Sequence, residues 1–162
     1  MELWKQITTF PDYSVSDEGS VRNDRTGHRL ALLRNQRGII HVGLNRGNAQ
    51  YKRSVTVLVA ETFLPPPPSE AFDTPINLNG DRSHNFVENL LWRPRWFAVR
   101  YHQQFFNDLR GYDRPIEEVE TGEQFETSWE AATRYGLIDT YIKMAIINEH
   151  RVWPTNQLYR VL

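Results

Sequence analysis

The sequence predicts an α+β protein made of three consecutive modules: a small β-rich module over residues 1–64, a ββα module with a following helix over residues 65–112, and a hairpin followed by two helices over residues 113–162. Short alternating runs separated by turn signals predominate before residue 55, as expected of strands. Four consecutive prolines at residues 65–68 interrupt the chain. Capping residues predict a helix pair around residue 136.

The first module is predicted from strand signals followed by one helix. Alternating or apolar runs bounded by turns predict strands at residues 13–16, 19–22 and 39–44. Residues 55–63 are compatible with a strand or a helix. Their apolar residues recur at helical spacing, so we predict a short helix there.

The second module begins at the four prolines, which hold a stiff polyproline II spacer of roughly 12 Å and mark a predicted module boundary. A turn at residues 79–81 and a strand at residues 89–92 follow. A helix is predicted from about Pro94, which suits a first helical turn, to about Asn107. Its aromatic residues are predicted to pack in the core rather than to stack on bases: Trp96, Phe97, Tyr101, Phe105 and Phe106.

The third module is predicted from its turn and capping residues. A hairpin over residues 116–125 turns at Thr121-Gly122. Thr127 and Glu130 have the spacing of a capping box, and Gly136 suits the end of that helix. Asp139 is predicted to cap a second helix. Helix, glycine turn and helix together have the shape of a helix-turn-helix, which many purely structural helix pairs share.

Composition excludes several classes of protein. The chain has 162 residues, of which 40% are hydrophobic, enough for a packed core. Because it has no cysteine, a disulfide scaffold, a cysteine-ligated zinc site and thiol catalysis are excluded. No run of about 18 apolar residues is present, and the first residues lack the pattern of a signal peptide. We therefore expect a soluble, intracellular protein without a membrane partner.

The net charge of −1 conceals a basic front half and an acidic end. Residues 19–53 include eight cations and one anion, Asp24, so this segment has a net charge of +7. Between residues 113 and 162 five cations face nine anions, so this segment carries −4. Most of the front cations are arginines, the better phosphate ligands, and we expect them to bind nucleic acid. They are Arg22, Arg25, Arg29, Arg34, Arg37, Arg46, Lys52 and Arg53.

Three groups of motifs follow one another along the chain. The first module contains Trp4-Lys5-Gln6-Ile7, then Tyr13-Ser14-Val15-Ser16-Asp17-Glu18-Gly19-Ser20-Val21-Arg22, and finally Leu58-Val59-Ala60-Glu61-Thr62-Phe63-Leu64-Pro65. The second contains Ile76-Asn77-Leu78-Asn79-Gly80-Asp81, Asn85 and Glu88-Asn89-Leu90-Leu91-Trp92. The third contains Glu120-Thr121-Gly122-Glu123, Phe125-Glu126-Thr127-Ser128-Trp129-Glu130-Ala131-Ala132 and Gly136-Leu137. In this order they resemble phage and organellar HNH homing endonucleases, with an N-terminal nuclease-associated DNA-binding domain, an HNH ββα core and a C-terminal helix-turn-helix module.

The resemblance implies a metal-dependent nuclease whose reacting groups this sequence lacks. In this branch of the family a His acts as general base, the Asp before it binds the metal, and an Asn on the following helix is a second ligand. The matching positions are Asn77, Ile76 and Ala98. An amide has no useful basicity, and Ile and Ala offer a metal no oxygen. The expected catalytic site is therefore degenerate, although the framework residues of the core remain.

Other residues could replace the missing groups. His84 and Glu88 are four residues apart and Asp81 is close in sequence, but we expect them in a loop rather than on one helix face. The family's first module usually has His-Arg where Thr56-Val57 stands, so its usual polar contacts are also altered. The other histidines have no partner at ligand spacing: His28, His41, His102 and His150.

We therefore predict a catalytically inactive, HNH-homing-endonuclease-like protein that binds double-stranded DNA as a repressor or site-blocking factor and needs no cofactor. In the helix-turn-helix module, the side chains expected nearest DNA are Tyr141, Lys143, Met144 and Asn148, with Thr140 at the start of the helix. Two alternatives stay open: an active Mg²⁺-dependent nicking endonuclease, and a phage–host or virion factor that binds a protein through its acidic C-terminal half. If the gene is phage-encoded, the expected location is the cytoplasm of the bacterial host.

Overall fold

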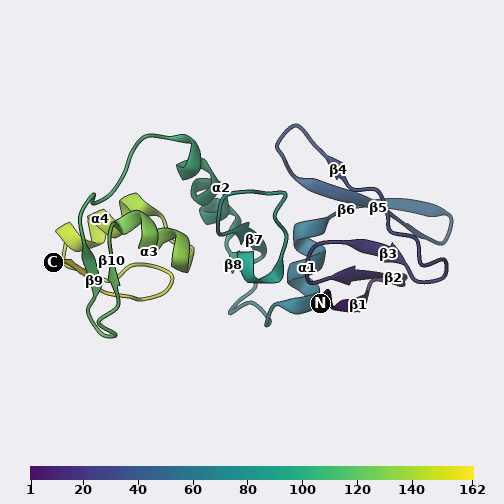
Figure 1. The fold of residues 1–162 in the computed structure, drawn as a ribbon, viewed down its shortest axis with the longest axis horizontal. Coiled ribbons are helices and arrows are strands. Elements are labelled where there is room, and N and C mark those ends of the chain that lie inside the picture. The colour runs from purple at the N-terminus through teal and green to yellow at the C-terminus, as the bar shows by residue number, and fades with distance from the viewer. The chain divides into compact units, whose positions relative to one another are not determined.

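The computed structural model describes residues 1–162 and divides them into two compact units, Met1–Arg95 and Trp96–Leu162 (Figure 1). The first contains one hydrophobic cluster, and the second contains another. The α+β class predicted from the sequence is confirmed, whereas the division into three modules stays a prediction. No helix is long and apolar enough to cross a membrane.

Two three-stranded antiparallel sheets form most of the first unit. One has the order β1-β2-β3 and consists of Trp4–Ile7, Phe10–Ser16 and Val21–Asn23. The other has the order β4-β5-β6 and consists of Leu33–Arg34, Ile40–Arg46 and Ala49–Ser54. The predicted strands lie in β2, β3 and β5. Strands β1, β4 and β6 were not predicted, because they are short or rich in polar residues and form by pairing with their neighbours.

Helix α1 (Val55–Phe63) joins the two sheets to the segment that follows them. The Ser54 hydroxyl caps it by accepting from the backbone N–H of Val57, and the helix ends before the four prolines, as predicted. Leu58 on α1 and Leu90 beyond the prolines belong to the same hydrophobic cluster. The prolines therefore end the helix, while residues on both sides of them pack in one hydrophobic cluster.

A two-stranded antiparallel sheet carries the segment that resembles the HNH core. β7 (Thr74–Asn77) pairs with β8 (Leu90–Arg93), so that Ile76 lies opposite Leu91. The loop between them contains a 3-10 helix, Val87–Asn89, where the sequence predicted the start of the strand. The Val87 N–H donates to the Asp17 carbonyl (2.9 Å), which attaches this loop to the first sheet.

The second unit combines three helices with a small sheet. After α2 (Arg95–Gln103) and a 3-10 turn (Gln104–Phe106), β9 (Ile116–Glu118) pairs with β10 (Gln124–Phe125) and with β11 (Tyr159–Val161). Helices α3 (Ser128–Tyr135) and α4 (Asp139–Ile147) form the predicted pair. β11 was not predicted, because its partner strand lies more than 40 residues earlier and no local signal marks it.

The capping residues of the helix pair behave partly as predicted. Gly136 ends α3 in the left-handed conformation (φ 67°), and the Thr127 hydroxyl accepts from the Glu130 N–H (3.3 Å). Asp139, however, does not cap α4: Ile138 occupies the cap position. The buried Asp139 carboxylate instead accepts from the Gly111 N–H (2.8 Å) and from the Ser128 hydroxyl, and so attaches α4 to the preceding segment.

Candidate nucleic-acid interface

Three of the eight predicted DNA-binding cations are neutralised within the first unit. Arg22 pairs with Asp24 (3.2 Å), Arg25 with Asp12 (3.2 Å), and Arg29 with Glu2 (2.8 Å). Asp12 and Glu2 precede the basic segment in the sequence and were therefore absent from its local charge. Ion-paired arginines at a surface contribute little net positive potential, so these three are poorer candidates for phosphate contacts.

The other five cations have no carboxylate partner, and all lie on the sheet β4-β5-β6 or its turns. They are exposed or half-buried, so a ligand can reach each of them. Unpaired cations on one sheet are the expected electrostatic footprint of a phosphate backbone. The five are Arg34, Arg37, Arg46, Lys52 and Arg53.

The turn between β4 and β5 presents two of these arginines. The Asn35 side-chain oxygen accepts from the N–H groups of Arg37 (2.9 Å) and Ile39 (3.0 Å), which fixes the turn while leaving the guanidinium groups free. Arg82, on the loop between β7 and β8, is a further cation nearby. Burial, and next the positive charge of Arg37, lower the pKa of Arg82. Arg82 was not predicted as a DNA-binding residue, because a single cation in a turn belongs to no recognisable sequence pattern.

The positions that match the family's catalytic residues are closed to solvent. Ile76 is 0% exposed and Asn77 is 2% exposed, both on β7. The Asn77 amide donates to the His84 carbonyl (3.0 Å) and to the Asn85 side-chain oxygen (3.0 Å). Ala98, on α2 in the second unit, is also buried. These residues do not fit a metal-activated hydrolytic site, since the buried Asn77 amide has no useful basicity and the Ile76 and Ala98 side chains offer a metal no oxygen.

Asn77 belongs to a network of asparagines that holds the loop between β7 and β8. Asn89 donates to the Asn79 side chain (2.9 Å) and to the His84 carbonyl (2.8 Å). The Thr56 hydroxyl, at a position where the family usually has His, donates to the buried Asn85 (2.6 Å). The polar groups of the loop between β7 and β8 therefore find their hydrogen-bond partners within the first unit.

The residues proposed as replacement ligands are engaged in local contacts. The Asp81 carboxylate accepts from the hydroxyl (2.6 Å) and the N–H (2.9 Å) of Ser83, and these hydrogen bonds lower the pKa of Asp81. His84 Nδ1 accepts from the Asn79 amide (2.7 Å), and its ring packs on Phe86. No group of three or more His, Asp or Glu side chains is arranged to hold a metal ion.

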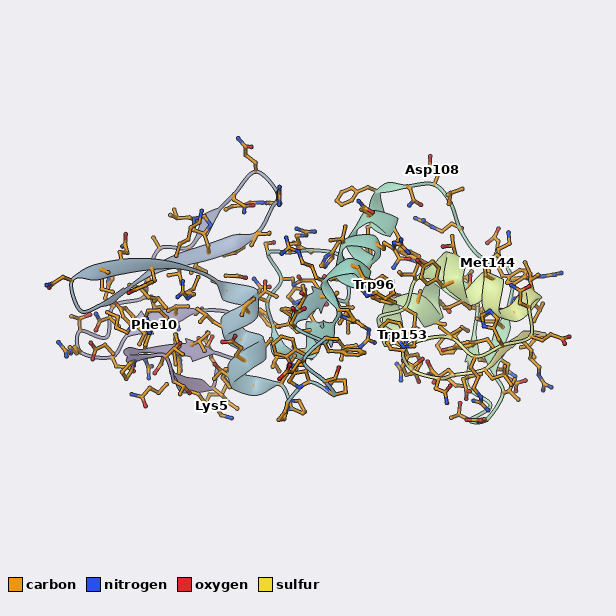
Figure 2. The ribbon with its side chains drawn as sticks, turned by 180° about the vertical axis from the view of Figure 1, so that it is seen from behind. Lys5, Phe10, Trp96, Asp108, Met144 and Trp153 are labelled. Carbon is orange, nitrogen blue, oxygen red and sulfur yellow. The ribbon has the colours of Figure 1, made fainter.

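Tyr141, Lys143 and Asn148, which were predicted to contact bases, lie in different surroundings on and just beyond α4. The Tyr141 hydroxyl accepts from Arg100, and the Lys143 ammonium lies 5.9 Å from the Tyr112 ring centroid. Asn148 is exposed just beyond the end of the helix. Met144, labelled in Figure 2, is half exposed on the same helix. Their role in reading DNA stays a prediction.

Several acidic side chains of the second unit are engaged in internal contacts. Three glutamates pair with arginines: Glu117 with Arg160, Glu120 with Arg151 and Glu123 with Arg134. Glu118 is buried, and burial alone would raise its pKa. Hydrogen bonds from Thr121 (2.8 Å) and the Leu158 N–H (3.3 Å) nevertheless hold the pKa of Glu118 below its usual value. The three ion pairs leave the net charge of −4 unchanged, whereas Glu118 and Asp139 are buried and contribute little to the surface that a partner would meet.

Comparison with known proteins places this geometry in context. Residues 2–45 match the NUMOD4 motif. An uncharacterised HNH endonuclease of Acanthamoeba polyphaga mimivirus is 29% identical over 89 residues, which are 55% of this chain and 26% of that protein. The structure of the HNH homing endonuclease I-HmuI, which describes DNA binding and cleavage by that enzyme, matches with a TM-score of 0.57 and 20% identity, over 99% of this chain and 98% of that one. These similarities confirm the resemblance that the motifs predicted.

Proposed function

For a chain that combines a NUMOD4 motif with the fold of an HNH homing endonuclease, we propose a function in DNA binding without cleavage, as a repressor or a factor that blocks a site. The supporting observation is a contrast within the first unit. Five cations suited to phosphate contacts stay unpaired on β4-β5-β6, whereas Asn77, at the position of the general base, is buried and donates two hydrogen bonds.

One experiment tests binding and cleavage together. Gel shifts on random and genomic duplexes would be recorded between low and moderate salt, and supercoiled plasmid would be incubated with Mg²⁺ or Mn²⁺. If the five unpaired cations contact four or five phosphates, log K against log salt should have a slope of roughly −4 to −5, because each phosphate contact releases about 0.9 counterion. No nicked or linear plasmid should form.

Two outcomes would contradict this proposal. A slope near zero would exclude phosphate contacts and favour a protein partner. Metal-dependent nicking that is lost in His84→Ala would favour the active endonuclease, since His84 is the half-buried imidazole nearest in sequence to the altered core.

Docking on another protein is a second candidate function, favoured by the surface of α4. Met144 and Ile147 lie one turn apart on this helix and are 50% and 53% exposed. A helix that reads bases usually presents polar side chains to the groove. Met144→Glu separates the two functions, because it should abolish docking by α4 while leaving the phosphate contacts of β4-β5-β6 unchanged.

A further inference from the structure

Two arginines of the first unit converge on one pair of aromatic rings. The Cζ atom of Arg46 lies 4.7 Å from the ring centroids of both Phe10 and Tyr51. The Cζ atom of Arg53 lies 5.2 Å from the same two centroids. The rings themselves are 5.7 Å apart and inclined by 60°. Each distance is within the range of a cation–π interaction.

The sheet holds this cluster in place. In the β5–β6 ladder Val42 lies opposite Arg53, Leu44 opposite Tyr51 and Arg46 opposite Ala49, so the two arginines and Tyr51 share one face. Phe10, labelled in Figure 2, comes from β2 and is 1% exposed. Both guanidinium groups are thus positioned by strands and a buried ring rather than by a mobile loop.

Most hydrogen-bond donors of the two guanidinium groups remain available. Arg46 donates to the Thr9 carbonyl (2.9 Å), and Arg53 donates to the Lys52 carbonyl (3.0 Å). A guanidinium has five N–H donors, and contact with an aromatic ring consumes none of them. Neither arginine has a carboxylate partner.

The same unit contains a matched cluster in which the charge is neutralised. Arg22 and Arg29 lie 4.4 and 5.1 Å from the ring centroid of Trp4. There, however, Asp24 pairs with Arg22 and Glu2 pairs with Arg29. A pair of arginines therefore packs against aromatic rings in two places. Arg22 and Arg29 have carboxylate partners within the chain, whereas Arg46 and Arg53 have none and can bind an external anion.

We propose that Arg46 and Arg53 form a preorganised clamp for a single phosphate of the DNA backbone. This inference rests on the proposed DNA binding and identifies two side chains that would make one of its phosphate contacts. The planar N–H fork of arginine matches two phosphate oxygens, and the rings remove much of the side-chain motion that binding would otherwise have to arrest. The clamp contributes affinity and position on the duplex, without base selectivity.

The test compares Arg46→Gln, Arg53→Gln and their double variant with Arg22→Gln/Arg29→Gln as the matched control. Salt-dependent gel shifts would use a random and a genomic duplex. The double clamp variant should weaken binding about equally on both duplexes and reduce the magnitude of the salt slope by about 1, the effect of one phosphate contact. Because both arginines serve one phosphate, the second substitution should add little to the first. The control should leave the slope unchanged.

Tyr51→Leu tests the role of the ring as a positioning group. It keeps both cations, so the salt slope should stay at the wild-type value while affinity falls severalfold. Far-UV circular dichroism checks the fold of each variant. If the Gln variants do not fold, Arg46→Lys/Arg53→Lys decides the question. That variant keeps the charges but loses the fork, and it should lower affinity at an unchanged slope.

Distinct results overturn the clamp and the proposed function. A slope reduced by nearly 2 in the double variant would mean two separate phosphates and would refute the single-phosphate clamp. If the double clamp variant loses no more DNA affinity than the control variant, the cluster does not contact DNA. Salt-dependent binding by the wild-type protein would then still support the proposed function. A wild-type slope near zero would refute both.

Discussion

At the scale of the residue, Asn77 has a structural role in the loop between β7 and β8. A general base must reach water or substrate, whereas Asn77 is 2% exposed and directs its amide into the β7–β8 loop. Its two acceptors are the His84 carbonyl oxygen and the Asn85 side-chain oxygen. The residue therefore stabilises the loop between β7 and β8.

Replacing Asn77 tests this structural role. Asn77→Ala should lower the free energy of unfolding by about 1–3 kcal/mol, because two hydrogen bonds are lost at about 0.5–1.5 kcal/mol each. Urea unfolding followed by circular dichroism measures the change. Asn48→Ala, at an exposed turn, is the control and should change stability by less than about 0.5 kcal/mol. An equal effect of the two substitutions would contradict the role assigned to Asn77.

At the scale of the element, the turn between β4 and β5 combines a fixed backbone with free cations. Asn35 holds the turn, and Gly38 at φ 80° adopts a conformation that other residues rarely accept. Arg34 and Arg37 project from this turn without ion pairs, and Arg82 on the β7–β8 loop adds positive charge beside Arg37. Such an arrangement favours phosphate binding, and it does not disturb the packing of the hydrophobic core because Arg34 and Arg37 lie on an exposed turn.

Substitution of this turn should reduce electrostatic binding without unfolding the protein. Arg34→Ala/Arg37→Ala should flatten the salt slope by up to about 2, because two independent phosphate contacts are lost at about 0.9 counterion each. The ion-paired Arg25→Ala/Arg29→Ala variant is the control and should change the slope much less. Salt-dependent gel shifts measure both. Equal slopes in the two variants would show that ion pairing does not decide which arginines contact DNA.

At the scale of the whole molecule, the functional groups are distributed unequally over the two units. All five unpaired cations and Arg82 belong to Met1–Arg95, which has its own hydrophobic cluster. In Trp96–Leu162 three glutamates are neutralised by arginines, and α4 presents apolar side chains. Non-specific affinity should therefore reside in the first unit.

Truncation after Arg95 tests this division. The fragment of residues 1–95 should fold cooperatively and retain nearly the full salt slope on random DNA. It should lose preference for the best genomic site if the helix-turn-helix module contributes base contacts, each worth about 1–3 kcal/mol. Thermal unfolding and gel shifts measure these properties. A fragment that keeps both its slope and its preference would show that α4 does not read bases and would favour its role in protein docking.

The sequence by itself determined the features that depend on neighbouring residues. Three local features were predicted and are present: the helix at Val55–Phe63, the glycine that ends α3 and the hairpin at β9–β10. Capping and turn signals act over a few residues, so no tertiary contact is needed to recognise them. The resemblance to HNH homing endonucleases followed from the order of such motifs.

Only the tertiary structure decided which charges are free and which polar groups are buried. Arg29 is neutralised by Glu2, 27 residues away. The Asp139 carboxylate accepts a hydrogen bond from the Gly111 N–H, 28 residues away, rather than capping its own helix. The convergence of Arg46 and Arg53 on Phe10 and Tyr51 likewise requires two sheets to meet. Contacts between distant segments leave no periodic trace in the sequence, because their geometry exists only after the chain has folded.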